Sequence, residues 1–156
     1  MPRLIHLNGP SGVGKSTVAR MYADRHPGVL DLDTDQIVSL IGGWQDAFWK
    51  ALHAGRALAI SMAETHLRTG HDVVMPQLAT QWSEVEGFEA AAARAGAEYR
   101  EIVLTIGKQQ MVERCTSRPP NIIDEIITRG GGPVLLAKIH DDLTAYLATR
   151  PNCVQV

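Results

Sequence analysis

A glycine-rich stretch near the N-terminus constrains the fold of this chain more than any other feature of the sequence. Residues 9–17 read Gly-Pro-Ser-Gly-Val-Gly-Lys-Ser-Thr and match the pattern G-x-x-x-x-G-K-[ST] at every fixed position. The stretch follows an apolar run at residues 4–7 and precedes a segment, residues 16–25, that is compatible with a helix. Such a strand–loop–helix unit turns backbone N–H groups and the positive end of a helix dipole toward one point. The pattern therefore predicts a loop that binds a polyphosphate.

Two side chains of this loop carry predicted roles. Lys15 is expected to reach the outer phosphates as a mobile point charge, and the Ser16 hydroxyl is expected to ligate the Mg²⁺ that accompanies ATP. The predicted nucleotide-binding positions are Gly9, Ser11, Gly12, Val13, Gly14, Lys15, Ser16 and Thr17.

Length and composition are those of one globular domain. The 156 residues are 45% apolar and 21% charged, which is ordinary for a folded domain of this size. The formal net charge of −2 disfavours a broad nucleic-acid footprint, and no apolar run reaches membrane-spanning length. Two isolated cysteines, Cys115 and Cys153, do not form a disulfide framework or a zinc site. We expect a cytoplasmic protein that is a monomer or homodimer and binds neither nucleic acid nor membrane.

Apolar runs and helical segments alternate along the chain. The predicted strands are residues 3–7, 29–32, 72–75, 99–106 and 152–156. The predicted helices are residues 15–25, 36–41, 45–68, 82–95, 108–117 and 133–148. This alternation predicts a three-layer α/β/α sandwich with a five-stranded parallel sheet, formed by a single domain over residues 1–156. On the first helix we expect Val18, Met21 and Tyr22 to face the core.

Polar side chains follow the second and third predicted strands. Asp33 and Asp35 come just after residues 29–32, and Gln77 follows residues 72–75. Because the carboxyl ends of parallel strands meet at one edge, these side chains are expected to share a crevice with Lys15. The two carboxylates could instead cap a helix that starts at Thr34 or Asp35, and Gln77 could cap a loop.

Further candidate residues lie in the helical part between the second and third strands. Arg56 lies on a cationic stripe that either faces a ligand or is a solvated surface. Trp44, Phe48 and Trp49 lie close together and could pack on a ring-bearing substrate, although core packing accounts for at least one of them.

The segment 118–132, between two predicted helices, has the composition of a mobile cover. It begins at Arg118, contains Arg129 and three consecutive glycines, and follows a predicted helix that carries Arg114. Either arginine of the segment could act on the nucleotide or occupy a plain surface position.

Taken together, these residues resemble the small P-loop kinases of the nucleoside monophosphate kinase group, most of all shikimate kinase, gluconate kinase and the chloramphenicol phosphotransferase type. The resemblance implies the strand order 2-3-1-4-5, a substrate-binding helical region at about 36–68 and a lid at about 118–132. It also implies that Asp33 assists Mg²⁺ and Asp35 contacts the substrate hydroxyl. Arg118 resembles the lid arginine that folds over ATP, and Arg129 resembles the arginine at the far end of the lid.

Two departures from these families narrow the expectation. Met75-Pro76-Gln77 stands where shikimate kinase has a triple glycine, which argues against shikimate as the substrate. The arginine pattern with which nucleotide kinases bind a second phosphate is not evident between residues 44 and 68, although Arg56 could serve.

The predicted activity is transfer of the ATP γ-phosphoryl group to a hydroxyl of a small molecule, with ATP and Mg²⁺ as cofactors. Asp33 is favoured as the carboxylate nearest the chemistry, but the two aspartates could exchange roles. One alternative is a nucleoside or nucleotide kinase in which Gln77 reads a base edge, and a second is an ATP-binding regulatory switch. The predicted site consists of catalytic Lys15, Asp33 and Arg118, nucleotide-binding Arg114 and Arg118, metal-binding Ser16 and Asp33, and substrate-binding Asp35, Trp44, Arg56, Gln77 and Arg129.

Overall fold

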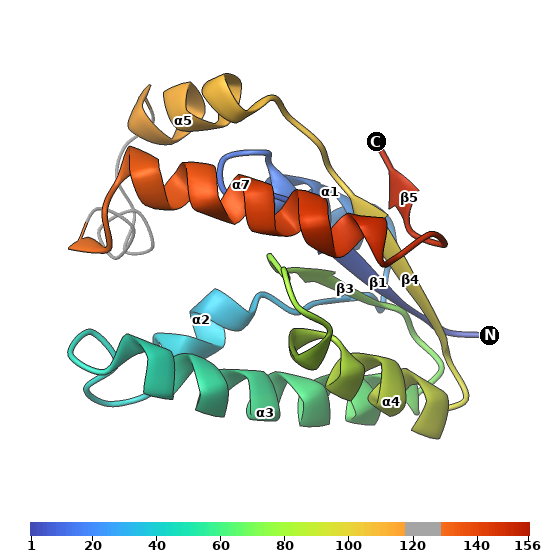
Figure 1. The fold of residues 1–156 in the computed structure, drawn as a ribbon. Helices are drawn as coiled ribbons and strands as arrows, with labels where there is room; N and C mark the ends of the chain where they lie inside the picture. Colours follow the sequence, from blue (N-terminus) through green and yellow to red (C-terminus); the bar gives the residue numbers. More distant parts are fainter. Residues whose placement is uncertain (118–128) are drawn as a thin grey trace.

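The computed structural model describes residues 1–117 and 129–156, which form a parallel sheet covered by helices on both faces (Figure 1). The five strands lie in the order β2-β3-β1-β4-β5, and every pairing is parallel. Both the sandwich and the strand order are therefore confirmed. The strands are β1 (Arg3–Asn8), β2 (Leu30–Asp31), β3 (Val73–Pro76), β4 (Glu98–Val103) and β5 (Val154–Gln155).

Strand β1 is central because its neighbours continue the sheet on both sides. Leu4 is in register with Val73 of β3 and with Tyr99 of β4. Every residue of β1 from Leu4 to Asn8 is buried, as expected for a parallel strand that helices cover on both faces. The phosphate loop begins directly at the carboxyl end of this strand.

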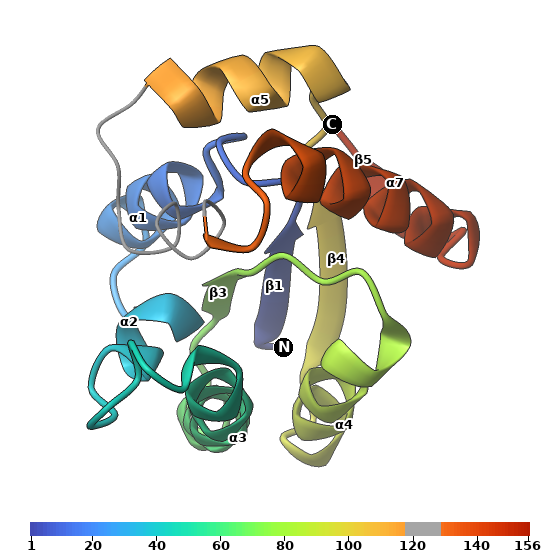
Figure 2. The ribbon, with the colours of Figure 1, turned by 60° about the vertical axis from the view of Figure 1, so that its left-hand side comes forward.

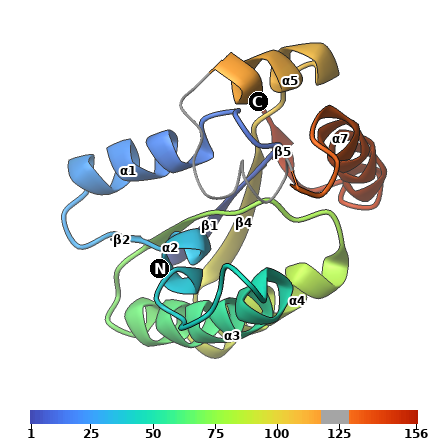
Figure 3. The ribbon, with the colours of Figure 1, turned by 90° about the vertical axis from the view of Figure 1, so that its left-hand side faces the viewer.

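The helices divide between the two faces of the sheet (Figures 2 and 3). On one face, α1 packs on Ile5, Leu7 and Val74, whereas α3 and α4 pack on Leu4 and Val73 on the other face. The helices are α1 (Lys15–Arg25), α2 (Thr34–Val38), α3 (Phe48–Leu67), α4 (Glu86–Arg94), α5 (Lys108–Ser117) and α7 (Pro133–Ala148), with a 3₁₀ turn η1 at Trp82–Glu84.

The inward face of α1 differs from the expected one. Ala19 and Ala23 are buried against the sheet, whereas Val18 and Met21 are exposed. Small side chains on this face allow α1 to lie close to the strands. The larger residues were expected inside because sequence hydrophobicity does not register how closely a helix approaches a sheet.

Helix α3 also presents small residues to the core. Ala51, Gly55, Ala59 and Ala63 are buried along one face, while the larger Met62 is exposed. At Gly55 the neighbouring α2 comes so close that an added Cβ would stand 2.7 Å from Cγ2 of Val38. The small face thus fixes the position of α2, and with it the start of the helical region between β2 and β3.

No helix within residues 1–117 and 129–156 combines the length and apolar character needed to cross a bilayer.

Candidate active site

The phosphate loop connects β1 to α1 and has the backbone shape of an anion cradle. Gly9, Gly12 and Gly14 all have positive φ, at 147°, 82° and 100°. At Gly9 an added Cβ would lie 2.5 Å from the carbonyl oxygen of Leu104, so only glycine fits between the loop and the segment after β4. Helix α1 starts at Lys15, so the N–H groups of its first turn, which have no acceptor within the helix, face the loop.

A carboxylate lies beside the first turn of α1. The Ser16 hydroxyl donates to Oδ2 of Asp33 over 3.3 Å, and Oδ1 of Asp33 accepts the backbone N–H of Asp35 over 3.0 Å. Asp33 therefore caps α2 with one oxygen and faces Ser16 with the other. This position is compatible both with the predicted capping role and with the predicted role as a Mg²⁺ ligand. Lys15 donates from Nζ to the carbonyl oxygen of Pro10 over 3.0 Å.

These oxygens fit Mg²⁺ bound together with a nucleotide. Mg²⁺ takes one or two protein oxygens and completes its shell with phosphate and water. Ser16 and Asp33 supply two such oxygens at the end of the phosphate loop. Within the described residues there is no cluster of three or more His, Cys, Asp or Glu side chains that would hold a metal ion by itself.

One cavity of about 360 Å³ joins the phosphate loop to the helical region. Its phosphate side is formed by Ser11, Gly12, Gly14, Lys15, Ser16 and Thr17. Its opposite side has polar residues, Asp35, Arg56, Gln77, Thr80 and Glu84, and apolar ones, Phe48, Trp49, Leu52, Pro76, Leu78, Leu135 and Ile139. We call this opposite side the acceptor half of the cavity.

The environment of Asp35 within this cavity changes its ionisation. Its side chain reaches solvent through the cavity, but the surrounding protein withdraws much of its hydration. This desolvation, reinforced by the nearby charge of Asp33, raises the pKa of Asp35 to about 6, against the opposing effects of Lys15 and Arg56. A carboxylate with such a pKa accepts a proton more readily than an ordinary surface aspartate.

Arg56 lines the acceptor half and is held there by Glu84. The guanidinium Nη2 lies 3.4 Å from Oε1 of Glu84, while Oε2 of Glu84 accepts the backbone N–H of Thr80 over 2.8 Å. This places a cation and an anion side by side on the wall opposite the phosphate loop.

Gln77 is buried where β3 ends and connects three parts of the site. Its side-chain oxygen accepts the Thr34 hydroxyl over 2.8 Å, and its backbone carbonyl lies 2.7 Å from Nε2 of His6. Burial lowers the pKa of His6, so the imidazole is neutral and donates to this carbonyl from Nε2. No described residue accepts a hydrogen bond from the Gln77 amide nitrogen, and the side chain lines the cavity.

Several predicted residues lie away from the cavity. Trp44 is buried in a core cluster with Val38 and Ala51, because the turn before α3 folds its ring inward. Arg114 on α5 and Arg129 at the start of the last described stretch are exposed and do not line the cavity. Arg118, and with it residues 118–128 of the predicted lid, lies outside the described residues.

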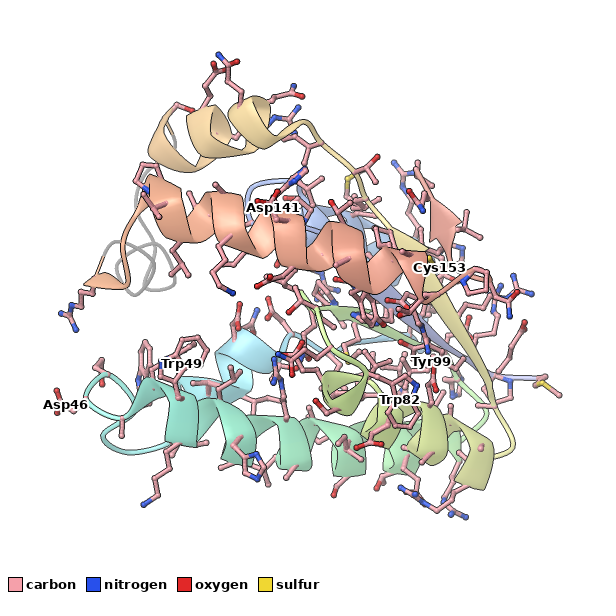
Figure 4. All side chains as sticks on the ribbon, viewed as in Figure 1. Asp46, Trp49, Trp82, Tyr99, Asp141 and Cys153 are labelled. Atoms are coloured by element: carbon pink, nitrogen blue, oxygen red, sulfur yellow. The ribbon has the colours of Figure 1, made fainter. Side chains whose placement is uncertain are left out.

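Sequence reasoning missed part of the acceptor half. Thr80 and Glu84 carry no motif, although Glu84 falls within the predicted helix 82–95, and neither Leu135 nor Ile139 of the last helix was expected at the site. The aromatic pair next to Trp44 was a partial signal, because Phe48 and Trp49 both line the cavity. Figure 4 shows Trp49 projecting from the start of α3 toward α7.

The phosphate loop, the capped acidic helix after β2 and the sheet order together define a P-loop protein with the topology of the small P-loop kinases. Residues 4–125 match the family described as AAA domain, and the chain belongs to this family. No curated protein sequence matches the chain.

Solved structures with this fold include an antibiotic resistance protein and two proteins described as kinases. The tunicamycin resistance protein of Deinococcus radiodurans aligns at TM-score 0.61 and 15% identity, over 100% of this chain and 86% of that one. A candidate kinase of Chloroflexus aurantiacus aligns at TM-score 0.66 and 21% identity, over 88% and 74%. A gluconokinase of Sinorhizobium meliloti aligns at TM-score 0.57 and 17% identity, over 96% and 93%. At these identities the likeness is one of fold.

Proposed function

We propose that this protein transfers the γ-phosphoryl group of ATP to a hydroxyl group of a small molecule. The observation that carries the proposal is the shared cavity, in which Asp35, with a pKa raised to about 6, lies opposite a phosphate loop that ends in Lys15 and Ser16. Phosphoryl transfer requires mainly the positioning of two reactants and the neutralisation of phosphate charge, and the two sides of the cavity offer these.

On the phosphate side, the loop amides and Lys15 hold the β- and γ-phosphates of ATP. Ser16 and Asp33 are the residues that would hold Mg²⁺, which, when bound, offsets the phosphate charge during transfer. Asp33 would thus serve both as a metal ligand and as the cap of α2. For Arg118 and Arg129 we keep the roles that the resemblance implies, contacts made by the lid.

On the acceptor side, Asp35 acts as the general base. The acceptor oxygen forms a bond to the γ-phosphorus, the bond from that phosphorus to the bridging oxygen breaks, and ADP leaves. The hydroxyl proton passes to the Asp35 carboxylate. Of the two aspartates, Asp35 is favoured as base because both oxygens of Asp33 are already engaged, by Ser16 and by the backbone of α2.

The nucleoside kinase alternative remains a special case of this proposal, since the Gln77 amide that faces the cavity can donate to a carbonyl oxygen of a base. The regulatory switch differs in that its nucleotide turnover needs no acceptor.

The test combines calorimetric titration with ATP–Mg²⁺ and an assay of acceptor-stimulated ADP release. Lys15→Ala is expected to abolish turnover while circular dichroism shows an intact fold. Asp35→Asn is expected to retain ATP affinity but to lower kcat about 100-fold or more, because a general base contributes on that order. Asp46→Asn, an exposed position away from the cavity, is the matched control and should retain full activity.

Two results would contradict the proposal. Absence of ATP binding in the calorimeter would remove the phosphate-loop assignment. ADP release that no hydroxyl compound stimulates, and that Asp35→Asn leaves unchanged, would favour the regulatory switch.

A further inference from the structure

The acceptor half of the cavity has an apolar wall that residues 1–117 and 129–156 leave uncovered. Phe48 and Trp49 of α3 stand at one end, with ring centroids 5.2 Å apart and planes inclined by 71°. Leu135 and Ile139 of α7 line the same cavity from another element. Trp49 is 72% exposed, although such a ring normally gains free energy from burial. A ligand with a flat apolar part would cover it.

The charges in the acceptor half do not suit an anionic ligand. Among the described residues that line this half, Asp35 and Glu84 are acidic and Arg56 alone is basic. Arg56 is already paired with Glu84, and the second oxygen of Glu84 accepts the Thr80 N–H. Among these described residues a phosphate or carboxylate on the acceptor would meet an acidic excess, and the one cation it could approach, Arg56, offers one buried unpaired N–H, at Nε, while Glu84 offsets its charge.

Polar groups that suit a neutral ligand are nevertheless present. Asp35 can accept a hydrogen bond from a hydroxyl, and the Gln77 amide nitrogen, which no described residue engages, can donate to a hydroxyl or carbonyl oxygen. Both groups can therefore recognise an uncharged ligand by its hydrogen-bonding groups.

We propose that the acceptor is an uncharged, ring-bearing hydroxyl compound, whose ring packs on Trp49 and Phe48 and whose hydroxyl meets Asp35. This inference rests on the proposed function and narrows it. It separates this chain from kinases of sugar acids and of nucleoside monophosphates. A sugar acid has a charge and no flat ring, and a nucleoside monophosphate has both a flat ring and a charge.

The experiment uses three probes that separate ring from charge. They are 1-phenylethane-1,2-diol, mandelate, which replaces the terminal CH₂OH of the diol with a carboxylate, and glycerol, which has no ring. Each probe is titrated, without nucleotide, into a Trp82→Phe variant while tryptophan fluorescence is recorded. This variant keeps Trp44, which is buried, and Trp49, so a change in emission on binding is assigned to Trp49. The diol is expected to alter the emission with a Kd about tenfold or more below that of mandelate, and glycerol is expected to have no effect.

Two pairs of variants test the residues. Trp49→Ala is expected to weaken diol binding, measured by calorimetry, about tenfold, whereas Trp82→Ala, which removes a ring that is 51% exposed outside the cavity, should leave it unchanged. Glu84→Gln retains an oxygen for Thr80 but frees Arg56, so mandelate should gain about tenfold relative to the diol. Glu86→Gln, an exposed neighbour on α4, is the control and should change neither.

Each outcome bears on one proposal. Mandelate that binds as well as the diol, or no response to any probe up to about 10 mM, would overturn the inference. A diol that binds at Trp49 but yields no phosphorylated product with ATP–Mg²⁺ would support the pocket chemistry and count against the kinase function. Phosphorylation of charged acceptors only would support the kinase function and overturn the inference of an uncharged acceptor.

Discussion

Asn8 and Glu101 are joined inside the protein by a hydrogen bond of 2.9 Å from Nδ2 to Oε1. Both side chains are buried, one at the end of β1 and the other on β4. Asn8 also accepts the backbone N–H groups of Gly9 and Ala79 and donates to the Ala79 carbonyl. The first residue of the phosphate loop and the segment that leads to the acceptor half are thus held by the same amide.

Glu101 extends this network to α7. Its carboxylate accepts the Tyr146 hydroxyl over 3.0 Å and Nε of Arg150 over 3.0 Å, while Arg150 also pairs with Glu89 of α4. Since α7 carries Leu135 and Ile139, the network connects the phosphate loop, the segment after β3 and the helical wall of the cavity. We infer that it keeps the two halves of the site at a fixed separation.

The first prediction concerns this network. Tyr146→Phe removes one hydrogen bond to a buried carboxylate and should lower the free energy of unfolding by about 1.5–3 kcal/mol. Thr144→Ala, on the exposed side of the same helix, is the control and should change it by less than about 0.5 kcal/mol. Urea denaturation measures both. Equal stability of the two variants would show that the network contributes nothing.

The sequence was sufficient for those parts of the fold that depend on local pattern. The glycine spacing at residues 9–17 predicted the loop, and the alternation of strands and helices predicted the layers. It was not sufficient where packing distance decides, as with Ala19 and Ala23 on α1, since a helix close to a sheet buries small residues rather than large ones.

The candidate site divides in the same way. The phosphate loop and the end of β2 lie at the same edge of the sheet, as the sequence predicted for Lys15, Ser16 and Asp33. They do so because the carboxyl ends of parallel strands meet at one edge. Glu84 and Glu101 could not be foreseen, because each is an ordinary residue type and its charged or buried partner, Arg56 or Asn8, is distant in the chain. Their significance arises only from burial and from contacts across elements.

The second prediction distinguishes two glycines of the phosphate loop. At Gly9 an added Cβ meets backbone at 2.5 Å and φ is strained for an L-residue, so Gly9→Ala should cost about 3 kcal/mol or more of folding stability. At Gly14 an added Cβ meets no protein atom within 4 Å, and only the strain of φ +100° remains, which costs about 1–2 kcal/mol.

Nucleotide affinity should separate the same two variants further. The Cβ of Gly14→Ala would enter the space that the loop offers to phosphate, so calorimetry should show weak ATP binding by a protein that remains folded. Normal ATP affinity in Gly14→Ala would contradict the assignment of this loop.

The third prediction concerns the contact between α2 and α3. In Gly55→Ala the new methyl group would lie 2.7 Å from Cγ2 of the buried Val38, so α2 must shift and carry Asp35 with it. We expect kcat to fall about tenfold and stability to fall by about 1–2 kcal/mol, because overpacking outweighs the higher helix propensity of alanine. Shortening Val38 to alanine in the same protein should restore kcat.

Gly87→Ala on α4 is the matched control for this contact. Its Cβ would meet only the flexible end of Ile60, which can turn aside without moving a helix, so kcat should not change. A similar loss of kcat in both variants would indicate a general loosening of the fold rather than displacement of Asp35.

The fourth prediction follows from the raised pKa of Asp35. A general base must be ionised, so kcat/KM for the acceptor should rise with pH through about 6 and reach a plateau above it. Arg56 lowers this pKa, so Arg56→Met should shift the midpoint of the profile upward. If kcat/KM for the acceptor, measured at saturating ATP, changes by about a factor of two or less between pH 5 and 8, Asp35 is not the base.

The same pKa makes an opposite prediction for stability. Folding raises the pKa of Asp35 from 3.8 to about 6, so within this window the folded chain binds more protons than the unfolded chain. Stability therefore falls as the pH rises from about 4 to about 6, and the ionised carboxylate is a net cost to the fold at neutral pH. Because Asp35 reaches solvent through the cavity, screening reduces this cost to about 1 kcal/mol.

Asp35→Asn should accordingly raise the free energy of unfolding by about 1 kcal/mol at pH 7 and have no effect near pH 4. Asp33→Ala, which removes the cap of α2, should instead lower the free energy of unfolding by about 1 kcal/mol. Urea denaturation at the two pH values distinguishes a carboxylate retained for catalysis, which costs stability, from one retained for structure, which contributes to it.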